Sequence, residues 1–376
     1  MDRNYRIASF SADFQPRSGL LIGPLTLLLN MRRASEFCSV SALIVTIPLM
    51  FQATVAHAQT DRVYPISGNM VSGKITDFKR DGVTIESGAN KQTFAVDQIQ
   101  KIMFEGDPAS LTKGREFALD GQWDQALDEL RGIELEKITR EFVKGDATFY
   151  LAQSEAHLAL VGRGNTAEAA KKMIAFATAN PQSIHFYSAA KLLGNLAVSM
   201  GSFDKAAQYY GALREAPSAD LKMEMLYLIG IAKLRQGKAE EAQTDFEKVI
   251  GASVQTTTAI RLRTLAKAGL AIALSQQGKA SEGLKLVDTL ISELNPADSE
   301  MASRIYNAQG ASFEVAGDHQ GAVMAYLHTH LMFSGQADAH AEALSHLVQL
   351  WPKLGKPDRA AEAREELQQR YPGWGK

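Results

Sequence analysis

Histidine side chains are concentrated near the end of this 376-residue sequence, where five fall within 28 residues: His319, His328, His330, His340 and His346. Imidazole is the commonest side-chain ligand of protein-bound metals, which makes a metal site one hypothesis. On a helix, however, His328 and His330 point about 200° apart and cannot bind one ion together. We therefore interpret these histidines as surface and groove residues of a helical region, and predict no metal site and no cofactor.

A second pair of side chains has the chemistry to hold a carboxylate. Lys191 and Asn195 stand four residues apart, which is one helical turn, so an ammonium group and an amide share one helix face. Together they can bind a carboxylate through one charged and one neutral hydrogen bond. The pair predicts contact with an acidic segment or a chain end of a partner protein.

The common catalytic motifs are missing from the sequence. No GKS or GKT phosphate loop, HExxH helix or GxSxG turn occurs. Residues 162–167 match G-x-G-x-x-A, but they follow a helical segment rather than a strand, so we interpret them as a turn between helices. Basic residues are scattered singly and the formal charge is -2, which argues against nucleic acid as a partner. The sequence predicts a protein that is not an enzyme.

A repeated turn motif indicates which helices position these side chains. Seven glycines at intervals of 36 to 43 residues are each followed five residues later by a small residue. The glycine ends one helix and the small residue lets the next helix pack closely against it. Large residues stand one turn beyond most of the small ones, on the same face. The pairs of glycine and small residue are Gly121 and Ala126, Gly164 and Ala169, Gly201 and Ala206, Gly237 and Ala242, Gly278 and Gly283, Gly317 and Ala322, Gly355 and Ala360.

This pattern resembles that of the tetratricopeptide repeat family from Ala109 to about Pro372. Five residues fill the family's small position seven before the turn glycine: Gly114, Gly194, Gly230, Ala271 and Gly310. Pro181 and Pro372 match its proline after the second helix. The pattern departs from the family at His157, Val348, Lys233 and Arg364. The resemblance implies a right-handed α-solenoid of about seven helix pairs that binds proteins or peptides along a groove lined by the first helices.

Within that groove the resemblance implies a set of partner-binding residues. Lys191 and Asn195 match the arrangement with which some family members clamp a terminal carboxylate. Arg304 and Asn307 are expected to face the groove in the sixth repeat, with Tyr227 between the two pairs in chain order. The competing interpretation is an ordinary solvated helix face, since three repeats separate the pairs.

Before the helices, residues 62–105 alternate between apolar and polar residues with a period of two, as in Val71, Gly73 and Ile75. This predicts four or five short antiparallel strands that either close into a small barrel, similar in outline to Sm-like barrels, or pack against the first helices. We expect this module to cap the helical array; a binding or oligomer site is the alternative.

The N-terminus has the features of a signal peptide. Met31-Arg32-Arg33 precedes an apolar stretch from Val40 to Phe51, and Ala56-His57-Ala58 fits the cleavage-site pattern. The stretch is shorter than the roughly 20 residues that span a membrane, so we predict cleavage between Ala58 and Gln59 and export to the periplasm or beyond. The alternatives are an uncleaved membrane anchor, and a true start at Met31.

The sequence thus predicts a targeting segment at 1–58, a β module at 59–107 and a solenoid at 108–376. Its lone cysteine, Cys38, precedes the predicted cleavage site, so the mature chain would contain no thiol ligand or disulfide. We expect an exported scaffold or adaptor for partner proteins. The alternatives are an accessory subunit of an envelope enzyme or secretion complex, and a carrier of small ligands through the β module.

Overall fold

The computed structural model describes residues 60–376 except 296, 373, 375 and 376. The targeting segment at 1–58 lies outside the described residues. The described part contains five strands followed by helices. The strands are β1 (Asp61–Pro65), β2 (Val71–Lys79), β3 (Gly82–Ser87), β4 (Asn90–Ala95) and β5 (Ile99–Met103), with the short 3-10 helix η1 (Val96–Gln98) between the last two.

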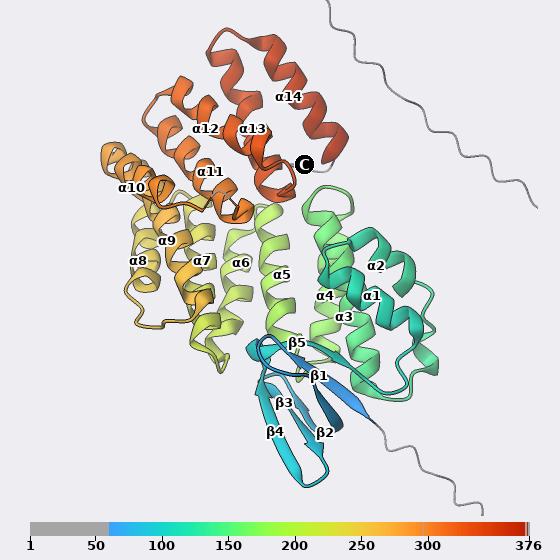
Figure 1. Cartoon of the computed structure of the whole chain (residues 1–376). Coiled ribbons are helices and arrows are strands. Elements are labelled where there is room, and N and C mark those ends of the chain that lie inside the picture. Colours follow the sequence, from blue (N-terminus) through green and yellow to red (C-terminus); the bar gives the residue numbers. More distant parts are fainter. Residues whose placement is uncertain (1–59, 296, 373, 375–376) are drawn as a thin grey trace, which may run out of the picture. The chain divides into compact units, whose positions relative to one another are not determined.

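The helices follow one another without further strands in the described residues (Figure 1). They are α1 (Ala109–Leu119), α2 (Trp123–Leu130), α3 (Glu141–Leu160), α4 (Thr166–Ala179), α5 (Phe186–Ser199), α6 (Phe203–Gly211), α7 (Ala219–Arg235), α8 (Ala239–Ile250), α9 (Thr257–Gln276), α10 (Ala280–Ser292), α11 (Ser299–Val315), α12 (His319–Met332), α13 (Ala337–Lys353) and α14 (Pro357–Arg370), with the 3-10 helices η2 (Leu135–Lys137) and η3 (Ala212–Glu215) in two connections. None of the described helices is long and apolar enough to cross a membrane.

These helices form seven consecutive pairs in which each helix packs on the next one along the chain. First helices of neighbouring repeats also contact each other, as α7 with α9, α9 with α11, and α11 with α13. The predicted fold class, a mainly helical solenoid preceded by a small antiparallel β module, is confirmed. Sequence spacing identified the architecture because six of the seven pairs reuse one short turn.

Each turn has a glycine with a positive φ, a conformation that residues with a Cβ rarely adopt. Six of the seven predicted turn glycines have it, for example Gly201 at 68° and Gly237 at 75°. The prediction was wrong in the second repeat, where Gly162 at 75° takes this role instead of Gly164. This turn is longer, because α4 begins only at Thr166. The Asn165 side chain caps α4 by accepting a hydrogen bond from the Glu168 N–H.

The small residues of the first helices accommodate large residues of the second. A Cβ added to Gly194 would lie 2.1 Å from the Tyr210 ring, and one added to Gly230 would lie 2.6 Å from the Phe246 ring. Gly310 and Tyr326 have the same relationship. Three helix pairs therefore interlock a glycine with an aromatic ring, and this explains why both positions recur in those repeats.

The β module is a five-stranded antiparallel sheet in the order β4-β3-β2-β1-β5. This order places β4 and β5 at the two edges, and no strand pairing joins them in the described residues. The sheet packs against the helices, which is the second of the two predicted arrangements. Val63, Val83 and Ile85 share one buried apolar cluster with residues of the first five helices.

The sheet contacts three successive first helices, so it does more than cover the end of the array. Lys101 of β5 bonds to Glu116 of α1 at 2.5 Å, and Phe78 of β2 stacks on Phe142 of α3 with ring centroids 5.2 Å apart. The Tyr187 hydroxyl of α5 donates to Asp81 at 2.7 Å. The module is thus held along the side of the first three repeats.

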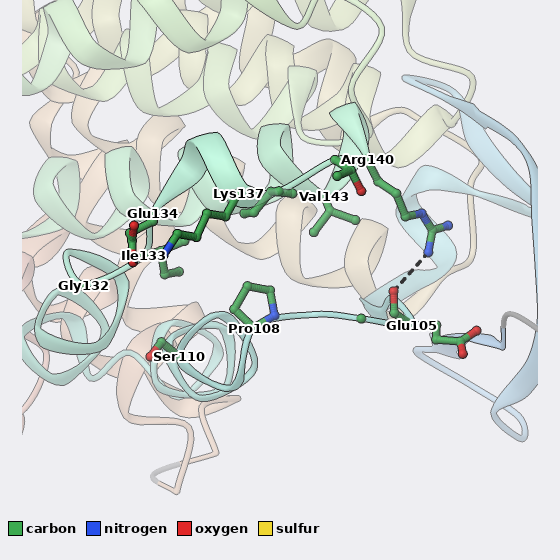
Figure 2. A pocket seen from close by; sticks show the side chains of 12 residues that line it. Glu105, Pro108, Ser110, Gly132, Ile133, Glu134, Lys137, Arg140 and Val143 are labelled. Carbon is green, nitrogen blue, oxygen red and sulfur yellow. Dashed lines mark hydrogen bonds and ion pairs between the residues drawn. The ribbon is translucent and has the colours of Figure 1, made fainter. Parts of the chain in front are cut away.

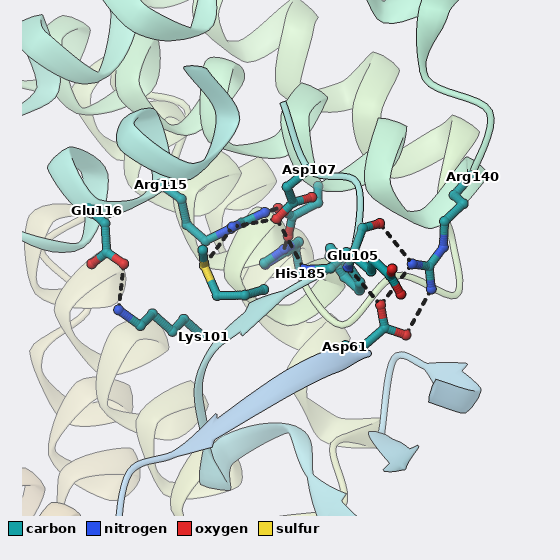
Figure 3. Close-up of polar contacts among 11 residues, drawn as sticks. Asp61, Lys101, Glu105, Asp107, Arg115, Glu116, Arg140 and His185 are labelled. Atoms are coloured by element: carbon teal, nitrogen blue, oxygen red, sulfur yellow. Dashed lines mark hydrogen bonds and ion pairs between the residues drawn. The ribbon is translucent and has the colours of Figure 1, made fainter. Parts of the chain in front are cut away.

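Two buried ionic contacts secure this junction (Figure 3). The Asp61 carboxylate accepts hydrogen bonds from both terminal nitrogens of Arg140, at 2.7 and 2.9 Å. The fully buried Arg115 guanidinium bridges Asp107, at 2.9 Å, and Asp146, at 2.7 Å. His185 lies 2.7 Å from the second oxygen of Asp146. Burying a charge costs free energy unless an opposite charge pairs with it. These ion pairs therefore favour one arrangement of the sheet on the helices.

Candidate functional site

A groove of about 250 Å³ lies on the first helices of the last four repeats. Its walls come from α7, α9, α11 and α13, whose exposed faces contribute residues at helical spacing. On α7 these are Tyr227, Ile231, Leu234 and Arg235. The other helices add aliphatic residues, among them Leu265 and Ile272 of α9, and polar residues, among them Asn307 of α11 and Glu342 of α13. The groove combines an apolar floor with a few polar groups, which is typical of binding sites.

Asn307 is the most informative of these side chains. Its amide nitrogen donates to the Ala339 carbonyl at 2.9 Å, and lies 3.3 Å from the Glu342 carboxylate. Only the nitrogen can donate to a carbonyl, so this contact fixes the orientation of the amide. The residue is only 6% exposed, and its oxygen, Oδ1, is buried without a hydrogen-bond partner in the described part of the chain. A buried acceptor without a donor costs about 1–3 kcal/mol, which a ligand N–H would recover.

The charged groups beside the groove are paired with one another. Arg304 lies 2.8 Å from Asp338, and Arg235 lies 2.6 Å from Glu342. Burial alone would lower the pKa of Arg304, but the carboxylates of Asp338 and Glu300 hold it above its ordinary value. The groove is therefore close to neutral in charge, and its two arginines are held in place by acids of α13.

Tyr227 adds a ring and a hydroxyl to the same groove. Its ring centroid lies 6.2 Å from that of Phe246, the aromatic residue that interlocks with Gly230. Burial raises the pKa of the Tyr227 hydroxyl, with nearby Arg304 acting in the opposite direction. The hydroxyl is thus protonated at ordinary pH and can donate a hydrogen bond.

The structure brings three of the five sequence-predicted site residues together in this groove: Tyr227, Arg304 and Asn307. It places Lys191 and Asn195 one repeat away, on α5. The Lys191 ammonium lies 3.0 Å from the Glu224 carboxylate of α7, and the Asn195 oxygen accepts from the Tyr210 hydroxyl at 2.7 Å. Both side chains therefore already have partners within the chain.

Two groove residues, Arg235 and Glu342, were not identified from the sequence. They form an ion pair across 107 positions of the chain, and no local pattern relates them. Helical spacing could have placed Arg235 beside Ile231 and Glu342 beside His346, since each pair lies one turn apart. The contact between α7 and α13 depends on how the repeats stack in space.

A larger hollow of about 470 Å³ lies where the chain passes from the sheet into the helices (Figure 2). It is bordered by Glu105, Pro108, the loop before α3 and the start of that helix. Its two basic side chains are already engaged: Lys137 with Glu134 at 2.8 Å, and Arg140 with Asp61 and the Glu105 carbonyl.

The comparisons with known proteins support the fold. No family model and no curated protein matches the chain. Among solved structures, a Rap protein complexed with Competence and Sporulation Factor is similar with a TM-score of 0.50 and 14% identity, covering 69% of this chain and 73% of that one. A tetratricopeptide repeat protein from Parabacteroides merdae ATCC 43184 is similar with a TM-score of 0.49 and 17% identity, covering 71% of this chain and 93% of that one. Together with the seven consecutive helix pairs, the likeness to the Rap protein confirms the helical solenoid predicted from the sequence.

Proposed function

We propose that this protein is an interaction scaffold that holds a segment of a partner protein in the groove formed by α7, α9, α11 and α13. The observation that carries the proposal is a groove with an aliphatic floor that is lined in part by Asn307, whose buried Oδ1 has no hydrogen-bond partner in the described residues. An apolar side chain of an extended segment would pack on Ile231 and Leu265, and a backbone N–H of the segment would donate to Oδ1 once a side-chain shift exposes this oxygen.

The charge arrangement narrows the class of partner. Arg304 and Arg235 are neutralised by Asp338 and Glu342, so the groove presents no excess of one sign. A partner segment of mainly apolar character fits it better than a strongly charged one, and its affinity should depend little on salt. The similar Rap protein was solved in complex with Competence and Sporulation Factor, which supports a partner-binding use of this type of fold.

Other uses are compatible with the same fold. Lys191 and Asn195 would extend the binding surface onto α5 for a partner that carries a carboxylate. An accessory subunit of an envelope enzyme or secretion complex would also use the groove, but for one fixed partner. A carrier of small ligands through the β module receives less support, because the cations of the nearby hollow are already paired.

Site-specific crosslinking in the producing cells tests this proposal. A photoreactive phenylalanine analogue replaces Ile231, which lines the groove, or Glu247, an exposed residue of α8 on the second helix of the same repeat. We expect a protein adduct from position 231 and none from position 247. Adducts of the same proteins in equal yield from both positions would contradict binding in the groove.

We also propose that the protein is exported, as the basic, apolar and Ala56-His57-Ala58 segments of its N-terminus indicate. The fold is compatible with cleavage after Ala58, since the first strand begins at Asp61 and would remain complete. In that case the groove would meet its partner in the cell envelope or outside the cell.

A further inference from the structure

Three side chains able to bind a metal ion converge near the last repeat: His330 of α12, His340 of α13 and Glu366 of α14. One ligand atom from each lies within 4.8 Å of the others. His330 Nδ1 is 2.9 Å from His340 Nε2, and the Glu366 carboxylate is 3.7 Å from His340 Nε2. The sequence drew attention to His330 and His340 as two of five clustered histidines, but it gave no signal for Glu366, which lies 26 residues beyond His340.

His328 and His330 point in different directions from α12, as the sequence predicts. His328 contacts the Met324 carbonyl of its own helix at 3.0 Å and stacks on Tyr306, whereas His330 reaches across to His340. The ligand pair is therefore formed between two helices rather than along one.

The separations fit a small tetrahedral ion. Zinc bonds to histidine nitrogen and carboxylate oxygen are about 2.0–2.2 Å long, which places ligand atoms about 3.3 Å apart. The observed 2.9 Å between His330 Nδ1 and His340 Nε2, and 3.7 Å between His340 Nε2 and Glu366 Oε1, lie on either side of this value. The ligand atoms of all three residues lie within 4.8 Å of one another, so side-chain adjustments would have to close the remaining separation.

The central histidine is already oriented. His340 is 0% exposed, and its Nδ1 lies 2.9 Å from the Tyr371 hydroxyl. A hydrogen bond at the distal nitrogen is the usual way in which proteins orient a metal-binding imidazole.

One cation lies close to the cluster. Arg370 Nη1 is 3.1 Å from Glu366 Oε1, and its other terminal nitrogen donates to the Ser334 carbonyl at 2.9 Å. The second oxygen, Oε2, has no contact with Arg370 and is the one 3.8 Å from His330 Nε2. Oε1, the oxygen 3.7 Å from His340 Nε2, is the one that Arg370 contacts, so an ion would share Oε1 with Arg370 or bind Oε2 after the carboxylate rotates.

We propose that His330, His340 and Glu366 form a zinc site with a fourth position open to water. Two imidazoles and one carboxylate are a ligand set that suits zinc. The ion would link α14 directly to α12 as well as to α13, and would therefore secure the last described helix of the array.

The test uses the full chain after chelator treatment, with zinc titrated by calorimetry and cobalt followed by visible absorption. The variants His330→Gln and Glu366→Gln remove one ligand each. The matched controls are His328→Gln on the same helix as His330, and Glu362→Gln, an exposed glutamate of α14 that pairs with Arg359. Far-ultraviolet circular dichroism verifies that each variant is folded.

We expect one zinc per chain in the wild type and both controls, tetrahedral cobalt absorption, and zinc affinity at least about tenfold weaker in His330→Gln and Glu366→Gln. Zinc should also raise the melting temperature of the wild type and the controls only. Equal zinc affinity in the wild type and the two ligand variants would overturn the proposal, as would the absence of saturable binding to the wild type. His340→Gln is left out because that side chain is fully buried.

Discussion

The ammonium group of Lys191 on α5 is bonded to both carboxylate oxygens of Glu224 on α7, at 3.1 and 3.0 Å. Glu224 precedes Tyr227 by one turn and so lies on the same face of α7. The chain therefore supplies its own carboxylate at the position where the sequence predicted one from a partner. A partner that uses Lys191 has to displace Glu224.

Glu224→Gln removes this competitor. For a partner with a carboxylate at Lys191, binding should become tighter in Glu224→Gln and weaker again when Lys191→Ala is added. Because both side chains are 28% exposed, we expect the substitution to cost less than about 1 kcal/mol of folding stability. Fluorescence anisotropy of a labelled partner segment measures the affinities. Identical affinity in all three proteins would remove Lys191 from the binding surface.

A second prediction concerns the interlocking of helices within a repeat. Gly194→Ala places a Cβ 2.1 Å from the Tyr210 ring, so it should destabilise the fold by about 1–3 kcal/mol. Gly211→Ala is the matched control, since Gly211 has helical backbone angles and nothing within 4 Å of its Cβ position. Urea unfolding measures both, and equal stability of the two variants would contradict the packing described.

A third prediction concerns pH and the attachment of the sheet. Burial alone would raise the pKa of Asp61, but hydrogen bonds from Arg140 and from the backbone N–H groups of Glu105 and Ile75 hold it below its ordinary value of 3.8. The stability contributed by this carboxylate is therefore complete above pH 3.8 and is lost as the pH falls through the lower, folded value.

Asp61→Asn should accordingly cost about 2 kcal/mol or more at pH 7, because it leaves Arg140 without its counter-ion. The difference from the wild type should begin to narrow below pH 3.8, where Asp61 of the unfolded wild type takes up a proton, and should close as the pH falls through the lower, folded pKa. Both proteins contain the other titrating groups of the junction, so the effects of these groups on stability cancel in the difference. One of them is Asp107, and burial raises its pKa. Urea unfolding at pH 7, 5 and 3 gives the result, and a difference that does not change with pH would contradict it.

A fourth prediction concerns the N-terminus. Cleavage at Ala56-His57-Ala58 would give a mature chain that begins at Gln59, which mass spectrometry of the native protein detects directly. An intact chain that contains Val40 and is recovered with the membrane fraction would instead support the uncleaved anchor.

The repeat architecture could be predicted because it depends on local chemistry that recurs. Gly201, Gly237 and Gly317 are required by a positive φ, and the small residues that follow are required by close helix packing. The same reasoning failed at Gly164, because Gly162 lies two residues earlier and Asn165 can cap a helix after a longer turn.

The polar sites could be predicted only in part. Tyr227, Arg304 and Asn307 were placed in the groove by the regular succession of first helices. The partners of Lys191 and His330 could not be predicted, since Glu224 and His340 meet them only through the stacking of helices in space. The contact of Asp61 with Arg140 likewise joins residues 79 positions apart.

The central claim, that the groove binds a partner segment at Asn307, is tested most directly by calorimetry with a synthetic peptide taken from the position-231 crosslinked adduct. Four proteins are compared: wild type, Asn307→Ala, Ala311→Trp, which fills the groove, and Ala361→Trp, which alters an exposed alanine of α14. We predict binding about tenfold weaker in Asn307→Ala, from the loss of about 1–3 kcal/mol, still weaker binding in Ala311→Trp, and wild-type affinity in Ala361→Trp. Equal affinity in all four folded proteins would contradict the account.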